Sequence, residues 1–191
     1  MRVLFLAGSP AAVSRSTLLL NYARRWLGLA EDEAVVCKVG DFCPKALLGG
    51  DYNHPDIHRL AAQIAEADGI VVASPVYKAA YSGALKALLD LLPERALANK
   101  VVLPLMTAGS PAHQLALDYA LKPVLSALKA EEIIGGVFAT DRQVQYGDAG
   151  RAETIAPEIL DRLEHQLEAF QSAIARRPVH QATIAGANAR S

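Results

Sequence analysis

The sequence has few cysteines, no long apolar run and no excess of charge of either sign. Cys37 and Cys43 are too few and too close together for a disulfide framework, which favours a reduced cytoplasmic protein. No apolar run approaches the roughly eighteen residues of a membrane-spanning helix, so no membrane association is predicted. Lysine and arginine total 19 against 20 for aspartate and glutamate. The resulting net charge of -1 gives no basic surface for a nucleic-acid backbone.

Several short signatures are also missing. The first residues lack the basic segment and long apolar core of a signal peptide, so export is not predicted. His54 and His58 are separated by Pro55 and have no third ligand near them in the sequence, so no metal site is predicted. We also find no Ser-His-Asp or Cys-His set of the kind used in nucleophilic catalysis.

The residues that are present indicate a folded domain of alternating strands and helices. Hydrophobic residues make up 52% of the chain and charged residues 20%, a composition that excludes a disordered protein. The periodicity predicts strands at 2–7, 34–39, 69–74, 100–106 and 132–139, and helices at 16–27, 55–67, 83–92, 113–129 and 157–175. This alternation predicts an α/β fold with a doubly wound, five-stranded parallel sheet of order 2-1-3-4-5 and helices on both faces, which is the flavodoxin-like plan.

The predicted domain occupies residues 1–175. The remaining segment, 176–191, is small, polar and without periodicity, and we expect it to be a flexible tail. Residues 141–153 are equally polar and are predicted to form a surface loop or flap.

Ligands of open α/β sheets bind outside the carboxyl ends of the strands, so the loops that follow the strands are the candidate site. The first loop has neither the GxGxxG of a dinucleotide fold nor the Gly-Lys pair of a P-loop. It offers the hydroxyls of Ser9, Ser14, Ser16 and Thr17 and the cation of Arg15 at the start of a helix, which suits a phosphate monoester. The alternative is that Ser16 is only a helix cap and Arg15 a solvated side chain.

Two further loops complete the candidate site. Pro75, Val76, Tyr77 and Lys78 follow a strand and offer a wall for a flat aromatic ligand, although Tyr77 could instead pack in the ordinary way. The next such loop is small and rich in backbone donors, which can approach the edge of a ligand closely. Its candidate residues are Thr107, Gly109 and Ser110. A phosphate cradle, an aromatic wall and a small backbone loop together predict a site for flavin mononucleotide (FMN).

The segments GSPAAVSRST, ADGIVVASPVYKAAYSGALKALLDLLPERAL, KVVLPLMTAGSPAH and LDYALKPVLSALKA resemble the NADPH-dependent FMN reductases of bacterial two-component alkanesulfonate monooxygenase systems. The resemblance implies that NADPH reduces FMN and that a separate flavin-dependent alkanesulfonate monooxygenase receives the reduced FMN. It also implies phosphate binding by Ser9, Arg15, Ser16 and Thr17, with the flavin ring near residues 75–78 and 107–110. Hydride passes directly to the flavin, so no catalytic side chain is predicted.

The helix predicted at 113–129 contains Pro123, which removes the hydrogen-bond donor that would serve the carbonyl of Tyr119. A π-bulge or a kink would relieve the resulting clash. The resemblance implies that Tyr119 is an inserted tyrosine of a π-helical stretch, at a tetramer interface near the flavin, and we therefore predict a homotetramer. The alternative is a plain kink with Tyr119 packed in the core.

Two other functions remain open at this point. A quinone or azo reductase on the same fold would hold FMN tightly and pass electrons to a second small molecule. A flavodoxin-type electron carrier would need a charged docking face, which the balanced charge does not favour.

Overall fold

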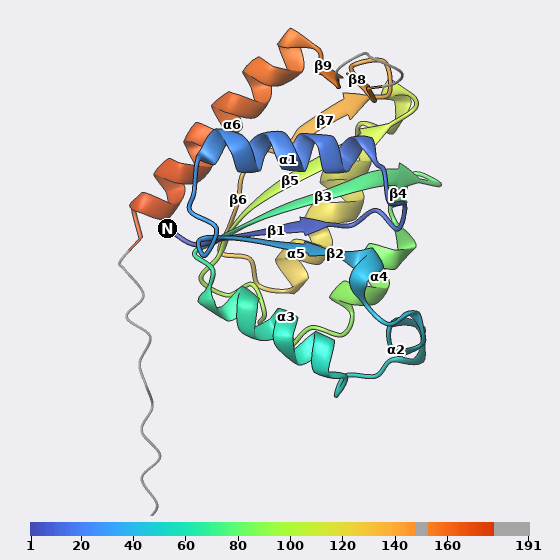
Figure 1. Ribbon diagram of the computed structural model, residues 1–191, viewed down its shortest axis with the longest axis vertical. Coiled ribbons are helices and arrows are strands. Elements are labelled where there is room, and N and C mark those ends of the chain that lie inside the picture. The colour runs from blue at the N-terminus through green and yellow to red at the C-terminus, as the bar shows by residue number, and fades with distance from the viewer. Residues whose placement is uncertain (148–152, 178–191) are drawn as a thin grey trace, which may run out of the picture.

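The computed structural model describes residues 1–147 and 153–177 and has a parallel sheet between two layers of helices (Figure 1). The strands of the sheet are β1 (Val3–Ala7), β2 (Ala34–Lys38), β3 (Gly69–Tyr77), β5 (Val101–Ala108), β6 (Glu132–Ile133) and β7 (Val137–Thr140). Their order is β2-β1-β3-β5-β6, with β7 also paired to β5. Because β6 and β7 are two parts of the fifth predicted strand, the predicted order is confirmed.

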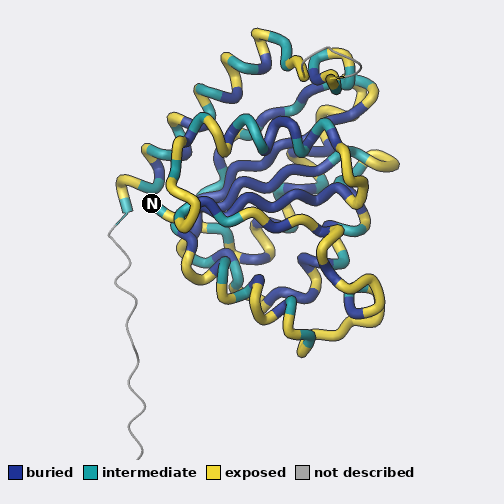
Figure 2. Tube along the Cα trace, viewed as in Figure 1, coloured by how far each residue is buried: buried dark blue, intermediate teal, exposed yellow. Residues whose placement is uncertain are grey.

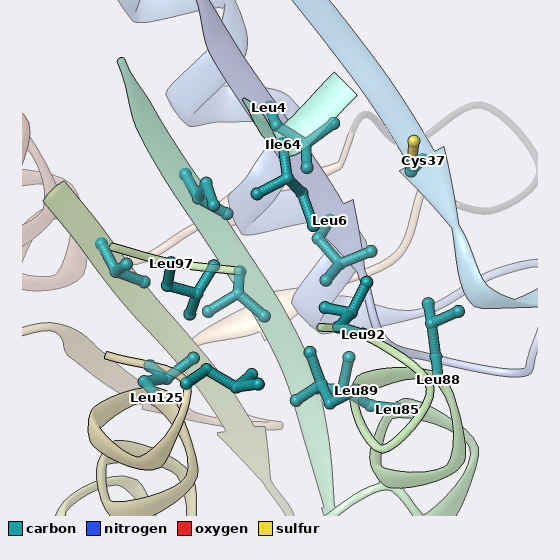
Figure 3. Packing of buried hydrophobic residues seen from close by; sticks show 14 of the residues in the cluster. Leu4, Leu6, Cys37, Ile64, Leu85, Leu88, Leu89, Leu92, Leu97 and Leu125 are labelled. Carbon is teal, nitrogen blue, oxygen red and sulfur yellow. The ribbon is translucent and has the colours of Figure 1, made fainter. Parts of the chain in front are cut away.

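Helices cover both faces of this sheet, as Figure 1 shows. They are α1 (Arg15–Leu27), α3 (Pro55–Glu66), α4 (Gly83–Leu89), α5 (Lys122–Ala127) and α6 (Pro157–Ala175), whereas the short α2 (Pro44–Gly49) lies beside α4. α1 and α6 pack on one face around Phe5 and Phe170, while α3, α4 and α5 pack on the other. Figure 3 shows leucines of the second layer, among them Leu85 and Leu125, against the strands.

The central strands are buried except at the end of β3, where Pro75–Tyr77 reach the surface (Figure 2). Every residue of β1 and of β5 is buried, as the nearly continuous apolar runs in the sequence require when helices cover both faces. The strands therefore form a rigid base, and their carboxyl ends carry the loops of the candidate site.

The fifth predicted strand is interrupted in the structure. The break lies between β6 and β7, where Gly136 has a φ of 87°. A Cβ atom at this position would lie 2.6 Å from the carbonyl oxygen of Pro104. The left-handed backbone and the close approach both require glycine, and they explain why the strand pairs with β5 in two separate pieces.

The predicted helix at 113–129 is not regular. It consists of a 3₁₀ turn, η2 (Pro111–His113), a π-helix, η3 (Leu117–Leu121), and then α5. The predicted widening before Pro123 is thus confirmed, because a π-helix supplies the extra residue that the proline requires. Tyr119 lies in this π-helix and is 78% exposed, so the alternative of a tyrosine buried in the core is wrong.

Other boundaries also differ from the prediction. β3 continues to Tyr77 and forms a hairpin with β4 (Ala80–Tyr81), so Pro75, Val76 and Tyr77 belong to a strand end and not to a loop. Lys78 and Ala79 form the turn, with φ values of 50° and 66°. A two-residue turn with positive φ matches the twist of a hairpin.

Part of the predicted surface loop at 141–153 has regular structure. Within it β8 (Val144–Gln145) pairs with β9 (Thr154–Ile155), and residues 148–152 lie outside the described residues. Of the predicted tail, 178–191 also lie outside them, whereas Arg176 and Arg177 lie beside Glu132 at 3.2 and 3.9 Å. Within residues 1–147 and 153–177, no helix has the length and apolar character needed to cross a membrane.

Candidate active site

Hydrogen bonds bring the first two candidate loops together. The amide of Gly8 donates to the carbonyl of Ala73 at 2.7 Å, which holds the end of β1 beside β3. The Ser82 hydroxyl donates to the carbonyl of Gly8, and its amide donates to the hydroxyl of Ser74 at 2.9 Å. A Cβ on Gly8 would lie 3.0 Å from both the carbonyl oxygen of Ala73 and the Cβ of Leu85, so the backbone at Gly8 packs closely against both residues.

The third candidate loop joins the first two through the sheet register. Pro75 of β3 lies opposite Thr107 of β5, so the segments that follow these residues start side by side. An open pocket of about 150 Å³ forms where the three segments meet. Its lining residues are Ser9, Ala11, Val13, Ser14, Arg15, Pro75, Val76, Tyr77, Thr107, Ala108, Gly109, Asp141 and Tyr146.

Most of the predicted site residues line this pocket, and the remaining ones lie around it. Ser16 is fully buried, and its hydroxyl lies 2.9 Å from that of Ser14. The Ser110 hydroxyl accepts a hydrogen bond from the amide of Ala112 at 3.2 Å. Neither of these side chains lines the pocket, and neither do Thr17 and Lys78.

The start of α1 presents its first backbone amides beside Ser14 and Arg15, which line the pocket. Ser14 is the N-cap, yet its side chain does not cap the helix, and the first turn contains no acidic residue. The first amides of a helix have no partner within the helix, and the helix dipole favours an anion at this end. This is the environment in which proteins bind phosphate groups.

Arg15 adds a cation that three neighbours hold in place. Its Nε donates to the carbonyl of Val144 at 2.9 Å, and its guanidinium lies 3.2 Å from a carboxylate oxygen of Asp141. The guanidinium carbon also lies 4.5 Å from the centroid of the Tyr146 ring. The Arg15 side chain is 30% exposed, and Arg15 lines the pocket.

Sequence reasoning did not find the contributions of Asp141 and Tyr146. Both residues belong to the polar segment predicted as a surface loop, and both come far after Arg15 in the chain. No local pattern marks them, because the contact depends on how β7 places this segment against α1. The Ser14 hydroxyl was expected from the serine-rich turn that also holds Ser9, and Ser14 lines the pocket.

The other side of the pocket suits a flat, apolar ligand. Pro75, Val76 and Tyr77 lie at the end of β3, and Tyr77 is 48% exposed. Tyr81, paired with Val76, is half-buried, and burial raises the pKa of its hydroxyl. The Tyr81 phenol therefore remains neutral near pH 7 and does not act as a base.

The donor set as a whole fits FMN. The α1 amides and Arg15 match a phosphate, the end of β3 matches a ring, and the backbone at Thr107–Gly109 can reach polar atoms of a ring edge. Among the described residues, the pocket lining contains no cysteine or histidine that could act as a nucleophile or base. In the described ranges, no three acidic, cysteine or histidine residues are grouped to hold a metal.

Comparisons with known proteins agree with this chemistry. Residues 1–145 match the family described as NADPH-dependent FMN reductase. An FMN reductase (NADPH) of Escherichia coli is 54% identical over 94% of this chain and 93% of its own. One of Pseudomonas putida is 50% identical over 93% of this chain and 90% of its own. The crystal structure of an NADH:FMN oxidoreductase in its apo form superimposes with a TM-score of 0.80, at 35% identity, covering 93% of this chain and 91% of that one.

The chain therefore belongs to the family of NADPH-dependent FMN reductases. It is an oxidoreductase whose substrates are NADPH and FMN. This assignment replaces the two alternatives that the sequence left open, a quinone or azo reductase and an electron carrier.

Proposed function

We propose that the pocket binds FMN as a dissociable substrate, with the phosphate at the start of α1 and the ring at the ends of β3 and β5. The observation that carries this proposal is the position of Arg15, whose guanidinium lines the pocket at an uncapped helix N-terminus. A dianionic phosphate gains charge-assisted hydrogen bonds there. Ser9 and Ser14 line the same end of the pocket and add hydroxyls.

The protein acts in this reaction by binding and orientation. When FMN and NADPH are both bound, hydride passes from the nicotinamide to the flavin ring. Pro75, Val76 and Tyr77 hold one face of the ring, while Thr107 and Gly109 contact its edge. The rigid strands below these residues fix the ring in place, and a correct approach of the two rings supplies most of the rate enhancement.

The coenzyme in this proposal is NADPH in preference to NADH. The two curated relatives carry NADPH in their names, while the solved structure is of an enzyme that uses NADH. Identity to the NADPH enzymes is higher, at 50 and 54% against 35%. This higher identity supports NADPH as the preferred coenzyme.

The product in this proposal is delivered to a flavin-dependent alkanesulfonate monooxygenase in the cytoplasm. Support comes from the open pocket, from which reduced FMN can leave, and from the resemblance of the four segments quoted above.

The proposal includes a homotetramer assembled through the π-helix η3. Tyr119 of η3 and Leu115, just before η3, lie one turn apart and are 78% and 62% exposed, as expected of side chains that a partner subunit covers.

An anaerobic assay with NADPH and free FMN tests this function. We expect NADPH oxidation that scales with the amount of added FMN, and a higher KM for riboflavin, which lacks the phosphate. A protein that retains FMN through purification and needs a quinone for turnover would contradict the proposal. So would equal use of riboflavin and FMN.

A further inference from the structure

Asp141 places a negative charge in the pocket that is proposed to hold a phosphate. Its carboxylate oxygen Oδ2 lies 3.2 Å from the Arg15 guanidinium, and the side chain is 41% exposed. The same oxygen would lie 3.8 Å from a Cβ atom placed on Gly109, which also lines the pocket. The carboxylate therefore sits between the cation of α1 and the loop after β5.

The backbone around Asp141 holds this charge in position. The amide of Asp141 donates to the carbonyl of Ala108 at 2.9 Å, which ties it to the end of β5. Two residues further on, the carbonyl of Gln143 accepts from the amide of Ala156 at 2.8 Å. The Gln143 side chain also accepts from Thr140 and donates to Glu158. The carboxylate thus projects from an anchored segment.

Asp141 is also dispensable for holding Arg15. The guanidinium has two neutral contacts besides the carboxylate, the Val144 carbonyl at 2.9 Å and the Tyr146 ring at 4.5 Å. Arg15 would keep these contacts without the charge on Asp141. A carboxylate in this place neutralises a cation that a bound phosphate needs, and it repels the phosphate directly.

We propose that Asp141 is a specificity-determining residue that weakens the binding of phosphorylated flavin and so favours its release. The inference rests on the proposed position of the FMN phosphate near Arg15. Asp141 competes with the phosphate for the guanidinium and leaves the binding of the ring unaffected. An enzyme that passes its flavin product to another protein benefits from such a competitor.

Flavin fluorescence titrations of the full chain with FMN and with riboflavin test this role. Asp141→Asn keeps the shape and removes the charge, and we expect it to lower the Kd for FMN about threefold or more, while the Kd for riboflavin stays the same. Asp141→Glu keeps the negative charge, and we expect its Kd for FMN to match that of the wild type. Glu66→Gln is the matched control, because it removes the carboxylate of an exposed pair with Arg2, outside the residues that line the pocket.

Each outcome separates the inference from the function on which it rests. Unchanged or weaker FMN binding by Asp141→Asn would overturn the inference, as would an equal shift for both flavins. Arg15→Ala tests the phosphate position independently. If Arg15→Ala leaves the Kd for FMN unchanged, the proposed site is wrong. If it raises this Kd while Asp141→Asn does not lower it, only the role of Asp141 fails.

Discussion

The guanidinium of Arg15 lies over the aromatic ring of Tyr146, with 4.5 Å between its central carbon and the ring centroid. This contact joins the start of α1 to the segment after β7. A cation over an aromatic face is attracted by the ring's quadrupole. Because both residues line the pocket, the contact fixes the cation where the proposed phosphate binds.

Removing the Tyr146 ring should loosen Arg15 and weaken FMN binding. We expect Tyr146→Leu to raise the Kd for FMN about two- to fivefold, the range of an exposed cation–π contact. Tyr146→Phe keeps the ring and should bind FMN like the wild type. Fluorescence titration measures the Kd for FMN of both variants. Equal effects of the two substitutions would contradict the role of the ring.

Removing the cation itself should have a larger effect. Arg15→Ala should weaken FMN binding about tenfold or more, because a hydrogen bond to a charged group contributes roughly 1.5–3 kcal/mol. Arg15→Lys should give an intermediate Kd, since an ammonium keeps the charge but loses the planar fork. Riboflavin binding should not change in either variant. A parallel loss for riboflavin would show that Arg15 supports the fold of the pocket and not the phosphate.

Coenzyme preference is measured by steady-state kinetics at saturating FMN. We expect a higher kcat/KM for NADPH than for NADH, because the two relatives at 50 and 54% identity are named for NADPH. Comparable values of kcat/KM for the two coenzymes would remove this part of the proposal.

Tyr119 allows the proposed tetramer to be tested. We expect sedimentation at micromolar concentration to show a tetramer for the wild type and a shift toward smaller species for Tyr119→Ala, with altered FMN retention or NADPH turnover. Tyr52→Ala is the matched control, because Tyr52 is 61% exposed and lies outside η3. A wild-type monomer would contradict the proposal, as would equal behaviour of both variants.

Gly69 is required where α6 packs on β3. A Cβ atom there would lie 2.4 Å from the Phe170 ring, so Gly69→Ala forces this buried ring to move. Overpacking a core typically costs about 1–3 kcal/mol of unfolding free energy. Gly49→Ala is the control, since nothing lies within 4 Å of its added Cβ. Urea denaturation should show a lower free energy of unfolding for Gly69→Ala and no decrease for Gly49→Ala.

Much of the fold could be predicted because it depends on local patterns. The apolar runs of β1, β3 and β5 are nearly continuous, and amphipathic segments alternate with them, which fixes a parallel sheet with helices on both faces. Pro123 likewise predicted the distortion at Tyr119, because proline lacks the backbone N–H that would bond to the Tyr119 carbonyl one turn earlier. The break at Gly136 was not predicted, since it depends on the distance to Pro104 of a neighbouring strand.

The sequence by itself determined the order of the strands, the loops that form the pocket and the position of Arg15 at a helix start. Only the tertiary structure decided which groups surround that cation. Asp141, Val144 and Tyr146 reach Arg15 because β7 pairs with β5 and carries the following segment over the start of α1. Periodicity and capping act within a few residues, whereas this contact is set by the sheet register between segments distant in the chain.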